Sequence, residues 1–84
     1  MKLKKNIALS DTGFVFDPSN GNSFSTNPIG LEIIQLLKQN KTQSEIETKI
    51  LATYEVDKNT FEKDYYDFVN MLGKLKLNAA DEKD

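Results

Sequence analysis

Short alternations of apolar and polar residues fill the N-terminal third of the chain, a pattern typical of β-strands. Residues 6–9, 13–17 and 22–26 are predicted as three strands. Asn20 and Gly21 stand between the last two, and both residue types tolerate the positive φ of a type I′ turn. The pattern therefore predicts an antiparallel hairpin that continues into a three-stranded sheet.

The third predicted strand is unusually polar. Phe24 is its only large apolar side chain, and Ser23 and Ser25 should point to the opposite face because side chains alternate along a strand. A strand of this kind is expected at the edge of a sheet rather than at its centre.

Three helices are predicted after the strands, because apolar residues then recur at intervals of three and four. The first covers residues 28 to about 39, the second residues 43 to about 54, and the third begins after Asp57. Each predicted start has a side chain suited to capping the first turn. These are Asn27 before Pro28, Thr42 in a capping box with Glu45, and Asp57.

Aromatic residues dominate the predicted core. The third helix has one apolar stripe, which consists of Phe61, Tyr65, Phe68, Leu72 and Leu75. Phe14, Phe16 and Phe24 of the strands are also expected in the core. Tyr66 lies off the stripe and is expected to be partly exposed. Gly30, in the first turn of the first helix, is expected to let another backbone come close.

The 84 residues are enough for one domain, ordered over about 6–77 and followed by a polar tail, 78–84. A sheet followed by three helices is an α+β fold. The helix order also fits a winged helix-turn-helix whose hairpin lies on the N-terminal side. A winged-helix module that binds DNA or another protein is therefore an alternative prediction.

Composition excludes most chemistry. The chain has no Cys, His, Trp or Arg, so thiolate nucleophiles and imidazole bases are absent, and no cofactor or metal site is expected. Its acidic residues are expected on solvated helix faces. A net charge of −2 weighs against nucleic acid as the partner. The sequence therefore predicts a protein that is not an enzyme.

Location is predicted from apolar stretches. No run approaches the 18 apolar residues of a membrane span, and the basic start of the chain is not followed by the apolar segment of a signal peptide. A cytoplasmic protein is expected.

The polar edge strand is the main candidate for a binding site. An edge strand presents unpaired N–H and C=O groups to another chain. Residues 22–26 have no Lys, Pro or inward-pointing charge to block them. If the third helix runs beside this edge, an extended peptide could add as a strand. The same edge could instead be covered, or pair with a second copy of the chain in a homodimer.

The segment from Ser10 to Leu37, SDTGFVFDPSNGNSFSTNPIGLEIIQLL, resembles the PqqD family. The resemblance extends over residues 6–77 and includes Asp64-x-x-x-Phe68-x-x-x-Leu72 in the third helix. It implies a RiPP recognition element, a domain that binds the leader of a ribosomally made precursor peptide. Such a domain presents the peptide to a modifying enzyme, often a radical-SAM protein, in the biosynthesis of pyrroloquinoline quinone (PQQ) or another peptide product.

The resemblance also implies where the leader would bind, namely against the third strand and the third helix. The strand residues carried over are Ser23, Phe24, Ser25 and Thr26. The helix residues carried over are Tyr65, Val69 and Leu72, with Lys76 available to an acidic leader. Thr26 departs from the family pattern, in which an apolar residue commonly precedes the Asn.

Overall fold

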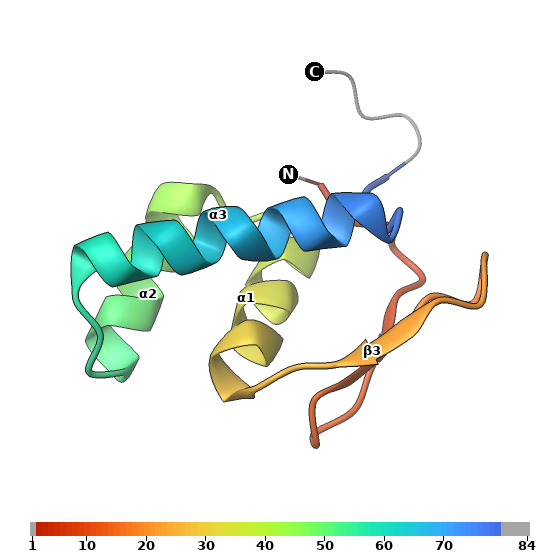
Figure 1. The fold of residues 1–84 in the computed structure, drawn as a ribbon, viewed down its shortest axis with the longest axis horizontal. Coiled ribbons are helices and arrows are strands. Elements are labelled where there is room, and N and C mark those ends of the chain that lie inside the picture. The colour runs from red at the N-terminus through yellow and green to blue at the C-terminus, as the bar shows by residue number, and fades with distance from the viewer. Residues whose placement is uncertain (1, 80–84) are drawn as a thin grey trace.

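Three short strands precede three helices in the computed structural model, which describes residues 2–79 (Figure 1). The strands are β1 (Ala8–Leu9), β2 (Phe14–Phe16) and β3 (Ser23–Ser25), and the helices are α1 (Pro28–Lys38), α2 (Gln43–Thr53) and α3 (Lys58–Lys74). The sheet is antiparallel with the order β1-β2-β3. The predicted α+β fold is confirmed, and so is the position of β3 at an edge of the sheet.

The two faces of β2 are the reverse of the prediction. Val15 is fully buried, whereas Phe14 and Phe16 are 46% and 37% exposed. The register is the reason: Val15 pairs with the half-buried Phe24, so both point inward. Side chains alternate along a strand, and the two phenylalanines therefore point outward, opposite Ser25 and Ser23. The prediction that Phe14 and Phe16 lie in the core is wrong.

The hairpin turn also differs from the prediction. Of its central residues, Gly21 has a positive φ of 80°, but Asn20 does not. Asp17 closes the loop, since its N–H donates to the Asn22 carbonyl and its carbonyl accepts from the Gly21 N–H, both at 2.8 Å. Pro18 follows Asp17 directly, and its fixed φ favours a longer turn. The connection is a four-residue loop, 18–21, and not a two-residue type I′ turn.

The helices begin where the capping residues predict. The Asn27 side chain accepts a hydrogen bond from the Gly30 N–H at 2.8 Å. Thr42 and Glu45 form the reciprocal capping box, and Asp57 accepts from the Thr60 N–H at 2.7 Å. These bonds satisfy N–H groups that have no partner within the helix.

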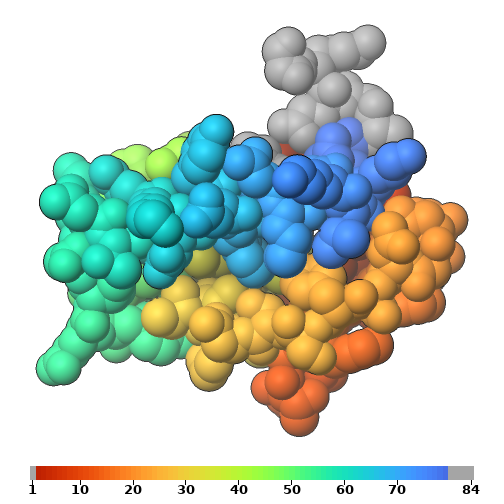
Figure 2. All heavy atoms as spheres, viewed as in Figure 1, coloured from red at the N-terminus to blue at the C-terminus, as the bar shows by residue number. Residues whose placement is uncertain are grey.

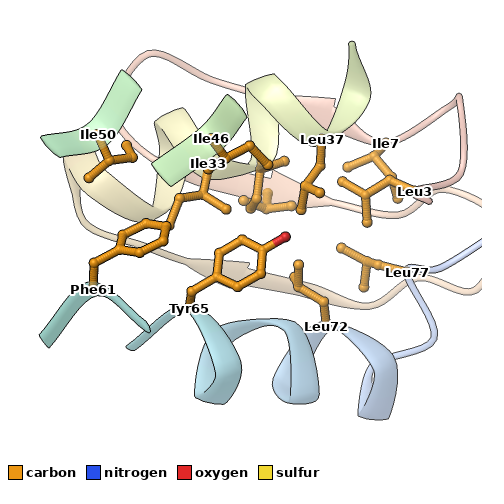
Figure 3. Packing of buried hydrophobic residues seen from close by; sticks show 12 residues of the cluster. Leu3, Ile7, Ile33, Leu37, Ile46, Ile50, Phe61, Tyr65, Leu72 and Leu77 are labelled. Carbon is orange, nitrogen blue, oxygen red and sulfur yellow. The ribbon is translucent and has the colours of Figure 1, made fainter. Parts of the chain in front are cut away.

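The core lies between the sheet and the helices (Figure 3). From α3, Phe61 and Tyr65 stack with their ring centroids 5.5 Å apart, and Leu72 is fully buried. The other buried apolar residues are Leu3, Ile7, Val15, Ile33, Ile34, Leu37, Ile46, Ile50 and Leu77.

The two ends of the described chain pair with each other, outside the range 6–77 that the pattern predicts to be ordered. Leu3 is buried and forms a β-bridge with Asn78. The Lys4 N–H donates to the Leu77 carbonyl at 3.0 Å, and the Ala79 N–H donates to the Lys2 carbonyl at 2.8 Å. Residues 80–84 of the predicted tail lie outside the described residues. Within residues 2–79 no helix is long and apolar enough to cross a membrane.

Candidate functional site

The free edge of β3 presents the backbone of two residues. The Asn22 carbonyl accepts from the Asp17 N–H at 2.8 Å and the Thr26 N–H donates to the Gly13 carbonyl at 2.9 Å, at the two ends of β2. Backbone groups alternate in direction along a strand, so those of Phe24 also face β2, and those of Ser23 and Ser25 point away from the sheet. Both serines are exposed. The edge therefore offers two N–H and two C=O groups to another chain.

The third helix lies along this edge and runs in the opposite direction (Figure 1). At the start of β3, the Asn22 side-chain amide donates to the Leu75 carbonyl at 2.9 Å. Beyond the other end of β3, Thr26 and the Phe68 ring both lie against Gly30. These two contacts place the C-terminal end of α3 at the beginning of β3, and the middle of α3 beside Thr26.

A hollow of about 460 Å³ opens between the end of β3, the first turns of α1 and the middle of α3. Its lining residues are Thr26, Asn27, Ile29, Gly30, Ile33, Asp64, Asp67, Phe68 and Met71. The space-filling view shows these three segments together on one face of the molecule (Figure 2). Apolar side chains and two carboxylates therefore lie directly beyond the free edge of β3.

Tyr65 and Leu72 do not form the helix wall to which the resemblance assigned them. Tyr65 is only 5% exposed and Leu72 is fully buried, so both pack in the core. Burial also raises the pKa of the Tyr65 hydroxyl. Val69 is half-buried against the same core. Lys76 is exposed and follows Leu75, the C-cap residue of α3.

The side chains of α3 next to the end of β3 precede the predicted ones by one residue. They are Asp64, Phe68 and Met71, where the prediction had Tyr65, Val69 and Leu72. One residue turns a helix by about 100°, which is enough to exchange the core face for the neighbouring one. Phe68 and Met71 are half-buried and line the hollow. The periodicity predicted Phe68 as part of the core stripe instead.

The strand residues divide into two pairs. Ser23 and Ser25 supply the outward-facing backbone groups, whereas Phe24 pairs with Val15 of β2 and the Thr26 N–H bonds to the Gly13 carbonyl just before it. The half-buried Phe24 packs against the core, and Thr26 lines the hollow. Ile29 and Ile33 of α1 also line it, and sequence reasoning assigned their helix face to the core alone.

The charged residues of the described chain bear on two alternatives, a metal site and DNA binding. Within residues 2–79 no group of three or more carboxylates could hold a metal ion. The sequence of α3 contains three Lys and three Asp or Glu residues, and therefore has no net charge. A DNA-recognition helix draws affinity from an excess of basic residues, so this helix gives the DNA-binding alternative no support.

The fold described above is a small α+β domain with one open sheet edge beside a helix, and comparison with known proteins supplies the family. The chain belongs to the PqqD family, since the model for coenzyme PQQ synthesis protein D (PqqD) matches residues 12–77. Members of this family are generally non-catalytic binding proteins. The family resemblance inferred from the sequence is therefore confirmed.

A solved structure supports the same assignment. The fold is similar to that of TbiB1, solved in complex with the TbiA(beta) leader peptide, with a TM-score of 0.82 and 29% sequence identity. The match covers 99% of this chain and 100% of that one. No curated protein matches the chain.

Proposed function

We propose that this protein is a non-catalytic adaptor that binds the leader of a ribosomally made precursor peptide as an added strand on β3. The observation that carries the proposal is the outward-facing backbone of Ser23 and Ser25, beside a hollow lined by Phe68 and Met71. Backbone bonds to an edge strand supply affinity, and side-chain pockets next to it supply specificity. The structural similarity to TbiB1, which was solved with a leader peptide, supports a leader peptide as the ligand.

The bound leader is then presented to a modifying enzyme. We propose a cytoplasmic partner such as a radical-SAM protein, in the pathway of PQQ or of another peptide product. The adaptor itself supplies no catalytic group, because it lacks His, Cys and Arg. Capture has to be reversible, so we expect a dissociation constant of about 1 μM, or about −8 kcal/mol.

An amide chemical-shift titration tests the proposal. Labelled protein is titrated with the small peptides encoded beside its gene. One of them should shift the amides of β3 and of the α3 face containing Phe68 and Met71. A folded spectrum that responds to none of these peptides would overturn the leader-binding function.

Two substitutions at Ser25 separate backbone pairing from other modes of binding. Ser25→Pro removes the N–H that points away from the sheet, and Pro is tolerated at such edge positions. It leaves the hydrogen bonds of Asn22 to Asp17 and of Thr26 to Gly13 in place. Ser25→Ala removes the hydroxyl but keeps the N–H. We expect Ser25→Pro to abolish peptide binding and Ser25→Ala to retain it, and equal binding by both would exclude strand addition at this residue.

A homodimer through β3 is the competing use of the edge. Sedimentation of the free protein at increasing concentration detects it. A dimer that Ser25→Pro dissociates, and that the peptide does not displace, would assign the edge to a second copy instead.

A further inference from the structure

The direction of the bound peptide follows from the order of charges along α3. This step rests on the strand addition proposed above. Two carboxylates, Asp64 and Asp67, lie at the hollow beyond the end of β3. Two exposed ammonium groups, Lys74 and Lys76, lie at the other end of the helix, where Leu75 contacts the beginning of the strand. The groove therefore has an acidic end and a basic end.

The peptide should run antiparallel to β3. Both strand pairs of the sheet are antiparallel, and antiparallel pairing is slightly the more stable arrangement per residue. Because β3 and α3 run in opposite directions, a peptide antiparallel to β3 runs in the same direction as α3. Its N-terminal part then lies at Asp64 and Asp67, and its C-terminal part at Lys74 and Lys76.

The acidic end can accept a basic residue. Within residues 2–79 no basic side chain pairs with Asp64, and none lines the hollow. Asp67 has a surface contact to Lys63 at 3.6 Å, with both side chains mostly exposed. A contact of this kind is weak and can be exchanged for one with a ligand.

The spacing of the charges follows from helix and strand geometry. Lys74 lies two helical turns after Asp67, so both side chains lie on the same side of α3. Seven residues of helix span about 10 Å, which matches about three residues of extended peptide. The wider pair, Asp64 and Lys74, spans about 15 Å of helix, or about four to five residues of extended peptide.

We infer that the leader carries a basic residue at its N-terminal side, a large apolar residue that enters the hollow, and an acidic residue about three to five positions after the basic one. The apolar residue would contact Ile29, Phe68 and Met71. A site with this order of charges would select peptides by their composition and also by the direction in which they bind.

Selection from a random library of twelve-residue peptides displayed on phage tests the inference. The wild type is compared with the variant Asp64→Lys/Asp67→Lys/Lys74→Glu/Lys76→Glu, which keeps the net charge and changes only exposed positions. Peptides that bind wild type but not Ser25→Pro are the edge-dependent set. In this set we expect basic before apolar before acidic residues, and the reverse charge order on the charge-exchanged variant.

Synthetic copies of the enriched peptides provide the quantitative test. Exchanging the basic and acidic residues within one peptide should weaken its binding to wild type about three- to tenfold, as two or more exposed ion pairs would. Three outcomes would overturn the inference and leave strand addition standing. The edge-dependent peptides could show no charge order, they could show the opposite order, or they could show the same order on both proteins. A selection that yields no edge-dependent peptide would overturn the strand-addition function as well.

Discussion

The ring of Phe68 on α3 lies against Gly30 in the first turn of α1, where an added β-carbon would come within 3.2 Å of the ring. The Thr26 side chain meets the same position from the end of β3. The missing side chain at residue 30 therefore allows a strand end, a helix start and a second helix to meet beside the hollow. The expectation that another backbone approaches Gly30 is wrong, because the close neighbours are the side chains of Thr26 and Phe68.

Gly30→Ala should destabilise the protein even though Ala is the better helix former. The gain in helix propensity is about 1 kcal/mol, but overpacking a closed contact costs about 1–3 kcal/mol. We expect a net loss of up to about 2 kcal/mol in the free energy of unfolding, measured by urea denaturation.

Thr26→Ala provides the matched control for this contact because it removes the hydroxyl that a β-carbon on residue 30 would meet. We expect the unfolding free energy of the double variant Gly30→Ala/Thr26→Ala to exceed the value predicted by adding the two single effects by at least about 0.5 kcal/mol, because the two positions are in contact. Additive effects of the two substitutions would mean that the contact between these positions is not tight.

Asp17 anchors the N-terminal segment to the hairpin. Its carboxylate is fully buried, pairs with the Lys4 ammonium at 2.9 Å, and accepts bonds from the Ser19 N–H and hydroxyl at 3.0 and 2.7 Å. Burial by itself would raise the pKa of Asp17, but the hydrogen bonds from Ser19 and Lys4 outweigh it and hold the pKa below its ordinary 3.8.

A lowered pKa makes the contribution of Asp17 dependent on pH. The ionised carboxylate contributes fully above the unfolded value of about 3.8, and its contribution is lost as the pH falls through the lower folded value. Asp17→Asn should cost about 2 kcal/mol at pH 7, because it removes charged hydrogen bonds in a buried site. The difference from wild type should shrink below pH 4, and parallel pH profiles of the two proteins would contradict this account.

The order of the elements and their starts could be predicted because both depend on local chemistry. Asn27, Thr42 and Asp57 cap their helices through bonds that span three residues. The polar character of residues 22–26 likewise indicates an edge strand without knowledge of the partner strands. These features are determined within short segments, where side-chain type is sufficient.

The orientation of β2 could not be predicted because it depends on distant contacts. Phe14 and Val15 are both good core residues, and only the pairing of Val15 with Phe24 decides which one points inward.

In α3 the periodicity correctly placed Phe61, Tyr65 and Leu72 in the core. It also included Phe68, which is half-buried and lines the hollow. Its distinction from the core residues depends on the positions of α1 and β3, which the sequence pattern does not contain.

Substitutions in β2 test the observed orientation of this strand. Val15→Ala removes two buried methyl groups and should cost about 2 kcal/mol of unfolding free energy. Phe14→Tyr adds a hydroxyl to a ring that is 46% exposed and keeps its apolar area. It should cost less than about 0.5 kcal/mol, since the position is accessible to water and Tyr retains strand propensity. Thermal and urea denaturation of both variants decide between the two faces, and a larger loss for Phe14→Tyr than for Val15→Ala would contradict the register.

Lys76, which follows the C-cap residue of α3, has a backbone conformation that suits glycine better. Its φ is 62°, and the Leu77 N–H donates to the Leu72 carbonyl at 3.0 Å, as in a Schellman motif. A residue with a β-carbon pays about 1 kcal/mol in this region. Lys76→Gly should therefore raise the unfolding free energy by about 1 kcal/mol, measured by urea denaturation.

Lys76→Ala is the control that separates backbone strain from charge, because it removes the ammonium group and keeps the β-carbon. Both variants should weaken the binding of an acidic peptide equally, while only the Gly variant gains stability. Asn40 has the same conformation after α1, with a φ of 63°, but Asn tolerates it well, so Asn40→Gly should gain less. Equal stabilities of Lys76→Gly and Lys76→Ala would show that the left-handed backbone at residue 76 carries no cost.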